Sequence, residues 1–214
     1  MYGMHILVTA GPTREALDPV RFLSNRSSGK MGFAVAAAAV GRGHTVTLVS
    51  GPVALAPPDG ASYVPVESAQ DMFVAVKAHL PDCDVLIMAA AVADWRPAQV
   101  SDQKLKKSSM DGVLTLERTP DILTSVHALK GSRVYVGFAA ETQSVEAEAR
   151  RKLNDKGLDL IVANDVSRAD AGFGVDTNVA TLIARNGEAE ALPLMSKADL
   201  AETILDRIAA LRPI

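Results

Sequence analysis

The stretch Arg21–Gly32 (RFLSNRSSGKMG) joins two segments whose patterns decide the fold. Before it, residues 5–9 (HILVT) form a short apolar run that ends in a Gly-Pro turn, which predicts a buried strand. After it, residues 29–42 are rich in alanine, which favours a helix, and residues 45–49 (TVTLV) predict the next strand. Residues 5–49 are therefore expected to form one β-loop-α-β unit with a right-handed crossover.

The same alternation of strands and helices continues along the chain. Further patterns predict strands at residues 63–66, 84–88, 113–116, 134–138 and 159–162, and helices at residues 68–80, 121–129 and 144–156. Asn186-Gly187 predicts a hairpin of residues 178–183 and 189–194, and Ser196 is expected to cap a terminal helix that ends near Leu211. The sequence thus predicts an α/β fold, a Rossmann-like, doubly wound and mostly parallel sheet with an appended antiparallel hairpin near the C-terminus. We expect residues 1–214 to form a single domain.

Composition excludes several classes of protein. The chain has 214 residues, of which 48% are hydrophobic, and a formal net charge of −3, so it lacks the basic character of a nucleic-acid-binding protein. We find no signal peptide and no apolar run long enough to span a bilayer. The single cysteine, Cys83, cannot form an internal disulfide, which favours a reducing compartment. We therefore expect a cytoplasmic protein that binds neither nucleic acid nor membranes.

The loop before the alanine-rich helix contains the residue types of a phosphate site. Gly11 and Gly29 would let the backbone approach a phosphate, and the N-terminus of the following helix favours an anion. The cationic and amide side chains that could contribute are Arg21, Asn25, Arg26 and Lys30. The alternative is an ordered loop whose cations face water, and composition alone leaves both interpretations open.

Three further runs follow predicted strands, where open α/β sheets bind ligands. Ala89–Pro97 combines small residues with Asp94, which could accept hydrogen bonds from sugar hydroxyls or hold a metal through water. Lys104–Lys107 could bind a triphosphate, although a charge run is usually a solvated surface. Phe138 could stack on a base, although an aromatic residue at a strand end is more often core. The last set contains Thr119–Ile122, Gly137–Thr142, Lys152 and Lys156.

Other catalytic schemes find little support in the sequence. The four histidines lack metal-ligand spacing, and Cys83 has no neighbouring histidine, so a buried, inert thiol is expected. The chain contains no G-x-S-x-G elbow and no P-loop lysine motif.

Seven motifs occur together in one order: Thr9–Glu15, Asp18–Arg21, Asn25–Gly32, Ala89–Asp94, Lys104–Lys107, Gly137–Thr142 and Ala163–Val166. Together they resemble bacterial phosphopantothenoylcysteine synthetase, the CTP-dependent phosphopantothenate–cysteine ligase of coenzyme A biosynthesis. The resemblance covers nearly the whole chain. Its most specific parts are the Asn25–Gly32 run and the lysine motif.

The resemblance implies a ligase that activates 4′-phosphopantothenate with CTP, releases pyrophosphate and couples the acyl-cytidylate to L-cysteine. It implies that Asn25, Arg21 and Lys104 are catalytic, with Lys104 in the activation step, and that Arg21, Asn25 and Ala91 bind the acyl substrate. The nucleotide-binding positions that follow are Gly11, Ser27, Gly29, Lys30, Ala89, Ala90, Ala91, Asp94, Lys104, Pro120, Asp121, Ile122, Leu123, Phe138, Lys152 and Lys156. Ser27 and Ser28 could be phosphate donors or helix caps, and the sequence leaves both roles open.

The resemblance also implies cofactors and partners. Mg²⁺ accompanies CTP, with Asp94 near the metal, and two copies form a homodimer in which the substrate site is completed across the interface. In many bacteria, a flavin-dependent phosphopantothenoylcysteine decarboxylase precedes this domain; it is expected to be fused or associated, and no FMN is expected in this chain. Residues 95–112, which lack periodicity, are expected to form a mobile loop that protects the activated intermediate from water.

Two alternatives belong to other functional classes. A nicotinamide-dependent reductase would have the same fold, but the lack of G-x-G-x-x-G after the first strand counts against it. A non-catalytic nucleotide-binding module would bind CTP without releasing pyrophosphate.

Overall fold

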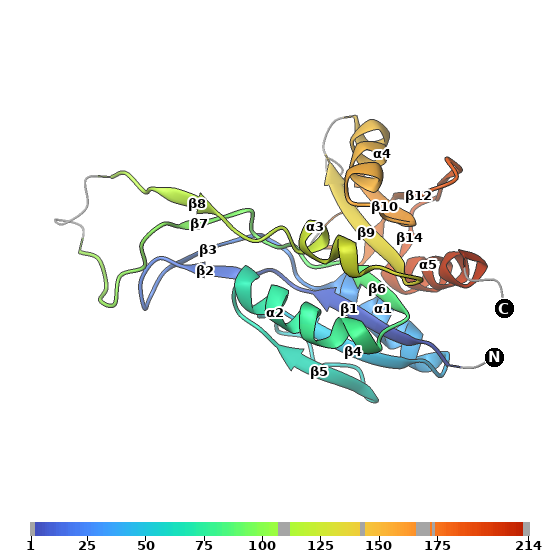
Figure 1. Cartoon of the computed structure of the whole chain (residues 1–214), viewed down its shortest axis with the longest axis horizontal. Coiled ribbons are helices and arrows are strands. Elements are labelled where there is room, and N and C mark those ends of the chain that lie inside the picture. The colour runs from blue at the N-terminus through green and yellow to red at the C-terminus, as the bar shows by residue number, and fades with distance from the viewer. Residues whose placement is uncertain (1–2, 107–111, 142–143, 166–171, 173, 212–214) are drawn as a thin grey trace.

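The computed structural model describes residues 3–106, 112–141, 144–165, 172 and 174–211, and an eight-stranded sheet forms the centre of this part of the chain. Six neighbouring strands are parallel, in the order β5 (Ala61–Pro65), β4 (Thr45–Ser50), β1 (His5–Ala10), β6 (Val85–Met88), β9 (Val134–Glu141) and β10 (Leu160–Asp165). At the far edge, β12 (Ala180–Ala184) pairs antiparallel with β10, and β13 (Ala189–Ala191) pairs antiparallel with β12. This arrangement confirms the predicted Rossmann-like fold and its C-terminal hairpin (Figure 1).

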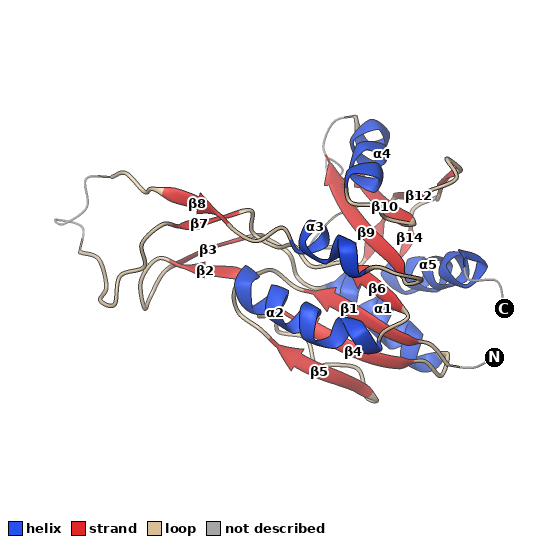
Figure 2. Ribbon diagram, viewed as in Figure 1, coloured by secondary structure: helices blue, strands red, loops and turns tan. Residues whose placement is uncertain are grey.

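Helices cover both faces of the sheet (Figure 2). The side chains of α1 (Lys30–Gly41) and α5 (Lys197–Leu211) pack on one face, and those of α2 (Ala69–His79), α3 (Ile122–Val126) and α4 (Val145–Asp155) pack on the other; the 3₁₀ turns η1 (Leu80–Asp82) and η3 (His127–Leu129) follow α2 and α3. Within β1, Ile6 and Val8 belong to the core beneath α1, whereas Leu7 belongs to the core beneath α2. All three are fully buried, as parallel strands covered on both faces require. None of the helices in the described ranges has both the length and the apolar composition of a bilayer-spanning segment.

Local capping signals set where two helices begin. The Ser68 side chain accepts a hydrogen bond from the backbone N–H of Asp71, and the Asp71 carboxylate accepts one from the backbone N–H of Ser68. Before α5, Oγ of Ser196 accepts a hydrogen bond from the backbone N–H of Asp199 at 3.0 Å. A short ladder of β11 (Thr177–Asn178) and β14 (Met195–Ser196) leads into this cap. The cap predicted at Ser196 is confirmed, and the helix predicted at residues 68–80 begins after a cap at Ser68.

Two ribbons that the sequence did not predict project from the sheet. β2 (Arg14–Ala16) pairs with β3 (Phe22–Ser24), and β7 (Trp95–Pro97) pairs with β8 (Leu116–Arg118). We call these two ribbons, with the described residues between their strands, the arm, and Figure 1 shows it extending away from the sheet. Each strand has three residues, which is too short to show an alternating pattern in the sequence.

The arm corrects two expectations. The strand predicted at residues 113–116 lies instead at Leu116–Arg118, because pairing with β7 sets its position. Residues 95–112, expected to be one loop, begin with the strand β7, and the ribbon continues where the N–H of Ala98 donates to the carbonyl of Thr115 at 3.0 Å. Residues 107–111 of this segment lie outside the described residues.

Candidate active site

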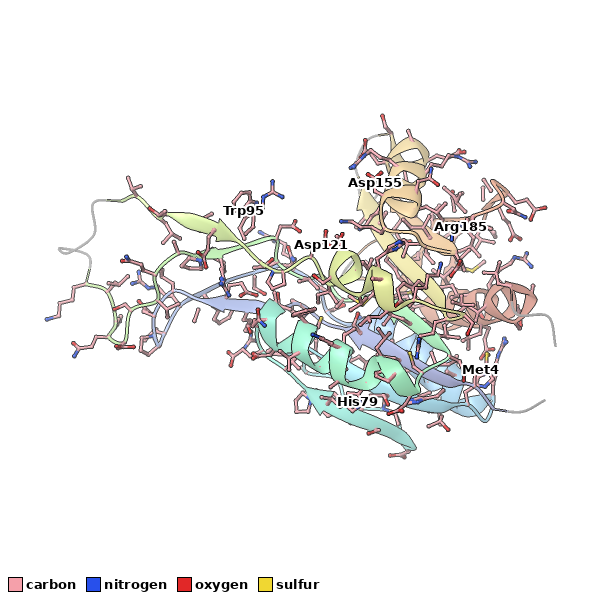
Figure 3. The ribbon with its side chains drawn as sticks, in the orientation of Figure 1. Met4, His79, Trp95, Asp121, Asp155 and Arg185 are labelled. Carbon is pink, nitrogen blue, oxygen red and sulfur yellow. The ribbon has the colours of Figure 1, made fainter. Side chains whose placement is uncertain are left out.

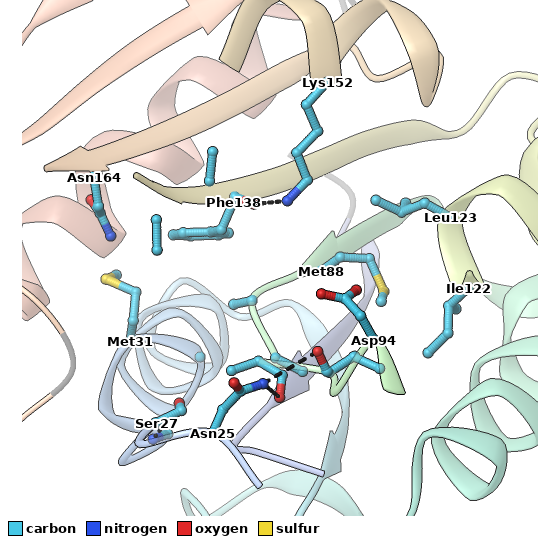
Figure 4. A pocket seen from close by; sticks show the side chains of 18 of the residues that line it. Asn25, Ser27, Met31, Met88, Asp94, Ile122, Leu123, Phe138, Lys152 and Asn164 are labelled. Carbon is cyan, nitrogen blue, oxygen red and sulfur yellow. Dashed lines mark hydrogen bonds between the residues drawn. The ribbon is translucent and has the colours of Figure 1, made fainter. Parts of the chain in front are cut away.

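A cavity of about 700 Å³ opens at the carboxyl ends of β6, β9 and β10 (Figure 4). Met88, Phe138 and Asn164, near the ends of these strands, contribute to its lining. Other parts of the lining come from the loop before α1, the residues after β6, the starts of α1, α3 and α5, one side of α4, and Trp95 and Arg118. Open α/β sheets bind their ligands at this edge.

The loop before α1 approaches the cavity through a turn that needs glycine. Gly29 has a φ of 78°, which residues with a side chain rarely adopt. A Cβ atom at this position would lie 2.8 Å from Cγ1 of Val53 and 3.4 Å from Cα of Gly11. Gly11 therefore supports the turn from behind and does not line the cavity. The hydroxyl of Ser27 accepts a hydrogen bond from the N–H of Gly29 at 3.3 Å, so it stabilises the turn.

Asn25 joins this loop to the small residues that follow β6. Its Nδ2 donates to the carbonyl oxygens of Ala91 at 3.0 Å and Val92 at 3.3 Å (Figure 4). Thr13 makes a neighbouring contact, since its Oγ1 accepts a hydrogen bond from the N–H of Ala93 at 2.9 Å. These bonds fix the amide plane of Asn25 and leave its Oδ1 without a donor in the described part of the chain.

Lys152 of α4 and Lys156, directly after α4, form the opposite wall together with the start of α3. Nζ of Lys152 donates to the carbonyl of Phe138 at 2.8 Å. Lys156 forms an ion pair with Asp121 and donates to Oγ1 of Thr124 at 3.0 Å. Burial would raise the pKa of Asp121, but the Lys156 ammonium and the N–H of Thr124 together hold this pKa below its usual value. Asp121 therefore stays ionised at neutral pH and holds Lys156 in place.

Lysines at the starts of α1 and α5 line a further side of the cavity. Nζ of Lys30 lies 2.7 Å from a carboxylate oxygen of Asp176. Lys197 is buried, and its Nζ donates to the carbonyl of Gly172 at 2.9 Å and to that of Val175. Burial lowers the pKa of Lys197. Both ammonium groups already have protein acceptors.

Asn164 is a polar group in the cavity that sequence reasoning gave no role. Its Oδ1 is buried and has no hydrogen-bond partner among the residues that the structure describes. Figure 4 shows its side chain near those of Phe138 and Met31. A buried acceptor without a donor costs free energy, and a water molecule in the cavity or a ligand N–H or O–H group would satisfy it. The signals available in the sequence were its place in the Ala163–Val166 motif and its position just after a predicted strand.

Comparison with known proteins gives the family. Residues 1–211 match the model described as the DNA/pantothenate metabolism flavoprotein C-terminal domain. The chain belongs to this family.

Two curated relatives show what the family domain belongs to. Both have the name coenzyme A biosynthesis bifunctional protein CoaBC; the chain is 52% identical to the Bacillus subtilis (strain 168) protein over 210 residues and 50% identical to the Escherichia coli (strain K12) protein over 209 residues. The alignments cover 98% and 96% of this chain, but 52% and 51% of the relatives. The chain thus spans about half the length of the curated relatives it matches.

Solved structures share the fold of the family domain. The C-terminal domain of a CoaBC protein is 46% identical, with a TM-score of 0.84 over 98% of this chain and 95% of that one. A DNA/pantothenate metabolism flavoprotein from Streptococcus pneumoniae is 26% identical, with a TM-score of 0.84 over 98% and 100% of the two chains. A Cab2 mutant H337A in complex with phosphopantothenate-cysteine is 16% identical, with a TM-score of 0.77 over 97% and 87% of the chains, and it shows the likeness of the fold alone.

Most residues predicted for the site of this family domain line the cavity. They are Asn25, Ser27, Gly29, Lys30, Ala89, Ala90, Ala91, Asp94, Pro120, Asp121, Ile122, Leu123, Phe138, Lys152 and Lys156. Arg21 and Lys104 lie on the arm and are not among the lining residues. Lys107 and Thr142, which belong to two of the predicted motifs, lie outside the described residues. The roles of all these residues remain predictions.

Contacts within the arm hold Arg21. Its guanidinium lies 2.6 Å from a carboxylate oxygen of Asp18 and donates to the carbonyl of Leu105 at 2.9 Å. The Arg21 guanidinium holds the pKa of Asp18 well below its usual range. The Arg21 side chain is nevertheless 41% exposed, so part of it can contact a ligand or a second chain.

Proposed function

We propose that this domain is a ligase of coenzyme A biosynthesis that couples 4′-phosphopantothenate to L-cysteine at the expense of CTP. The observation that carries the proposal is the cavity, in which Asn25 and the small residues after β6 face the lysine-bearing wall of α4. Two phosphate-bearing substrates need room and cations, and a cavity of about 700 Å³ with several lysines offers both. The name of the curated relatives, a coenzyme A biosynthesis protein, supports the same assignment.

A carboxylate is a poor electrophile, so the reaction needs two steps. A carboxylate oxygen of phosphopantothenate attacks the α-phosphorus of CTP, pyrophosphate leaves, and an acyl-cytidylate forms. The amine of cysteine then attacks the acyl carbon, CMP leaves, and the new amide nitrogen loses a proton. Residues that bind both substrates at once supply most of the catalytic effect, because they hold the reacting atoms together.

Each part of the cavity suits a different task. Lys152 and Lys156 would bind the phosphates of CTP, with Lys156 exchanging Asp121 for a phosphate oxygen. Phe138 would offer its ring to the base. Asn25, with its amide plane fixed by two carbonyl groups, would position the acyl intermediate through Oδ1.

Mg²⁺ would enter with CTP. Among the described residues there is no cluster of three or more side chains suited to hold a metal ion, and Asp94 is the carboxylate we assign to it. This donor set suits Mg²⁺, which is commonly bound by one or two carboxylates, phosphate oxygens and water. When bound, the ion would neutralise part of the charge of the triphosphate.

We further propose a homodimer in which the arm of one copy completes the cavity of the other. Arg21 and Lys104, implied to be catalytic, do not line the cavity of their own chain. The arm also exposes large apolar side chains, since Val20 and Val100 are 59% exposed and Phe22 is 47% exposed. Apolar groups gathered on a projecting ribbon are typical of an interface.

The chain as a whole corresponds to one half of a bifunctional relative. We assign the ligase reaction to this half, and we assign the decarboxylase reaction, with its FMN, to the other half or to an associated protein. We place the reaction in the cytoplasm, where a chain whose one cysteine is a buried thiol needs no oxidising environment.

Pyrophosphate release tests the proposed function against both alternatives. We expect release with CTP, phosphopantothenate and cysteine together, and much slower release when ATP replaces CTP. A nicotinamide-dependent reductase would instead bind NADP(H), and a non-catalytic module would bind CTP and release nothing. Absence of release with CTP and both other substrates would refute the ligase assignment.

A further inference from the structure

The cationic side chains that line the cavity differ in whether they already form ion pairs or hydrogen bonds within the protein. Lys30 pairs with Asp176, Lys156 pairs with Asp121, and Lys152 and Lys197 donate to backbone carbonyls. Arg118 also lines the cavity, but within the described ranges its guanidinium makes neither a hydrogen bond nor an ion pair. The lysines therefore share their ammonium groups with protein acceptors, whereas the N–H groups of Arg118 have no acceptor among the described residues.

Trp95 holds the guanidinium of Arg118 in place. The two residues are directly opposite in the antiparallel ribbon of β7 and β8. The central carbon of the guanidinium lies 5.1 Å from the centroid of the Trp95 ring, within the range of a cation–π contact. Both residues line the cavity, and Figure 3 shows Trp95 on the part of the arm nearest to Asp121. A cation–π contact uses no N–H donor as a hydrogen bond to a protein acceptor, so the N–H groups of Arg118 can still donate to a ligand.

The neighbouring arginine of the same ribbon provides a contrast. Arg96 is opposite Glu117 and forms an ion pair with it at 2.7 Å. Successive side chains of a strand point to opposite faces, so the Arg96–Glu117 pair faces away from the Trp95–Arg118 pair. One face of the ribbon thus carries a neutralised pair, and the face that borders the cavity carries Arg118, which forms no ion pair with any described residue.

The backbone beside Arg118 is hydrogen-bonded to the segment that joins β6 to β7. The N–H of Thr119 donates to the carbonyl of Asp94 at 3.1 Å, and its hydroxyl donates to the carbonyl of Ala93 at 2.5 Å. Arg118 is therefore held at a defined position on the rim. A guanidinium in a fixed orientation suits two parallel hydrogen bonds to one phosphate group.

We propose that Arg118, supported by Trp95, binds a phosphoryl group of one of the two phosphate-bearing substrates. This inference rests on the proposed function for the identity of the substrates, and it adds a binding residue and a positioning residue to the site. The source of the phosphoryl group is either the triphosphate of the nucleotide or the phosphate ester of phosphopantothenate.

Titration calorimetry of Arg118→Gln separates the two sources. Mg²⁺–CTP, inorganic pyrophosphate and phosphopantothenate are each titrated alone. We expect one source to bind about tenfold more weakly, the loss typical of a charge-assisted hydrogen bond, while the other is unchanged. Arg96→Gln is the matched control, because it removes an arginine from the same ribbon, and it should change neither affinity. Unchanged binding of all three ligands in Arg118→Gln, or equal losses in Arg96→Gln, would overturn the proposal.

Substitutions of Trp95 test the positioning role. Trp95→Phe keeps an aromatic face beneath the guanidinium and should retain most of the affinity for the ligand that Arg118 binds. Trp95→Leu removes that face and should lower the affinity for the same ligand and for no other. If Phe and Leu variants lose affinity equally, Trp95 does not act through its aromatic ring.

Two further measurements distinguish the binding role of Arg118 from the proposed dimer and from the proposed ligase function. Light scattering should show the same oligomeric state for Arg118→Gln and the unmodified protein; a loss of affinity explained by dissociation would overturn the binding role. Pyrophosphate release is then measured on the unmodified protein. If that protein binds CTP through Arg118 but releases no pyrophosphate, the proposed function fails while the binding role stands.

Discussion

Asn25 and Lys104 occupy different parts of the molecule. We therefore expect substitutions of the two residues to block different steps of the reaction. In Asn25→Asp, a carboxylate would face the carbonyl oxygens of Ala91 and Val92 in place of a donor. The lysine wall stays intact, so acyl-cytidylate should form, but its misplaced acyl group should react with cysteine about a hundredfold more slowly. Lys104→Gln should prevent the acyl-cytidylate from forming.

Rapid quenching with radiolabelled CTP measures both variants. The intermediate should accumulate in Asn25→Asp after cysteine is added and should be missing in Lys104→Gln. The reverse pattern would exchange the two roles, and equal accumulation in both would remove the distinction between activation and transfer.

Single residues also show what the sequence could reveal about the site. Asn25, Asp94 and Phe138 were candidates because Asn25 and Asp94 lie in runs of small and polar residues and Phe138 ends a predicted strand; the family resemblance implied their roles, and all three line the cavity. Asn164, although part of the Ala163–Val166 motif, and Arg118 were given no role in the site, because the evidence for each is a partner missing among the described residues: a donor for a buried amide oxygen and an acceptor for a guanidinium. Such a property depends on what the folded chain brings nearby, and no local pattern encodes it.

At the scale of elements, α1 sets the position of the loop that lines the cavity, and two of its glycines differ in their surroundings. A Cβ atom on Gly32 would lie 2.6 Å from Cβ of Ala10 and 3.0 Å from the carbonyl oxygen of Thr9. Gly32→Ala should therefore push α1 away from β1 and reduce the free energy of unfolding by about 1–3 kcal/mol. Because Gly32 also lines the cavity, CTP binding should weaken.

Gly41→Ala is the matched control within the same helix. A Cβ atom there would meet nothing within 4 Å, so alanine should raise the free energy of unfolding by less than the ~0.5–1 kcal/mol typical of a helix interior, because Gly41 is the last residue of α1. Urea denaturation of both variants provides the comparison. Equal effects of the two substitutions would show that helix propensity, and not contact with β1, explains Gly32.

The elements that were predicted correctly have strong local signals. Residues 5–9 form a run of apolar residues, Ser68 caps α2, and Asn186-Gly187 connects β12 to β13. The arm was not predicted because its information is not local: Trp95 in β7 pairs with Arg118 in β8, and each strand has three residues. Its strands form because distant segments meet, and their own composition does not require it.

At the scale of the whole molecule, buried neutral acids predict a loss of stability in alkaline solution. Burial raises the pKa of the Cys83 thiol to about 11 and that of the Tyr135 hydroxyl to about 12. As pH rises above about 9, the unfolded chain loses these protons while the folded chain keeps them, so the free energy of unfolding falls. For Cys83 the loss should approach about 2–3 kcal/mol near pH 11.

Chemical denaturation between pH 7 and pH 10.5 tests this dependence. Cys83→Ala removes one titrating group, so its stability should fall less steeply with pH than that of the unmodified protein. Parallel curves would mean that the thiol titrates alike in the folded and unfolded chains. The buried position of Cys83 agrees with the inert thiol expected from the sequence.

The proposed dimer makes the sharpest prediction at this scale, because it assigns one site to two chains. Arg21 is carried by the arm, whereas Asn25 is fixed at the cavity by Ala91 and Val92. If the arm of one copy serves the cavity of the other, Arg21→Gln and Asn25→Asp damage different contributors to each site. A mixed dimer then contains one site with both defects and one site with neither.

Mixing the two inactive variants should therefore restore activity. With random pairing, half of the dimers are mixed and one of their two sites is intact, so the recovered rate should be about a quarter of that of the unmodified protein. Each variant alone must remain dimeric by analytical ultracentrifugation, since loss of Arg21 also leaves the Asp18 carboxylate without its ion pair. If both variants are dimeric and exchange subunits but no activity returns, Arg21 acts in the cavity of its own chain, and the arm has to bend back toward it in the catalytic state.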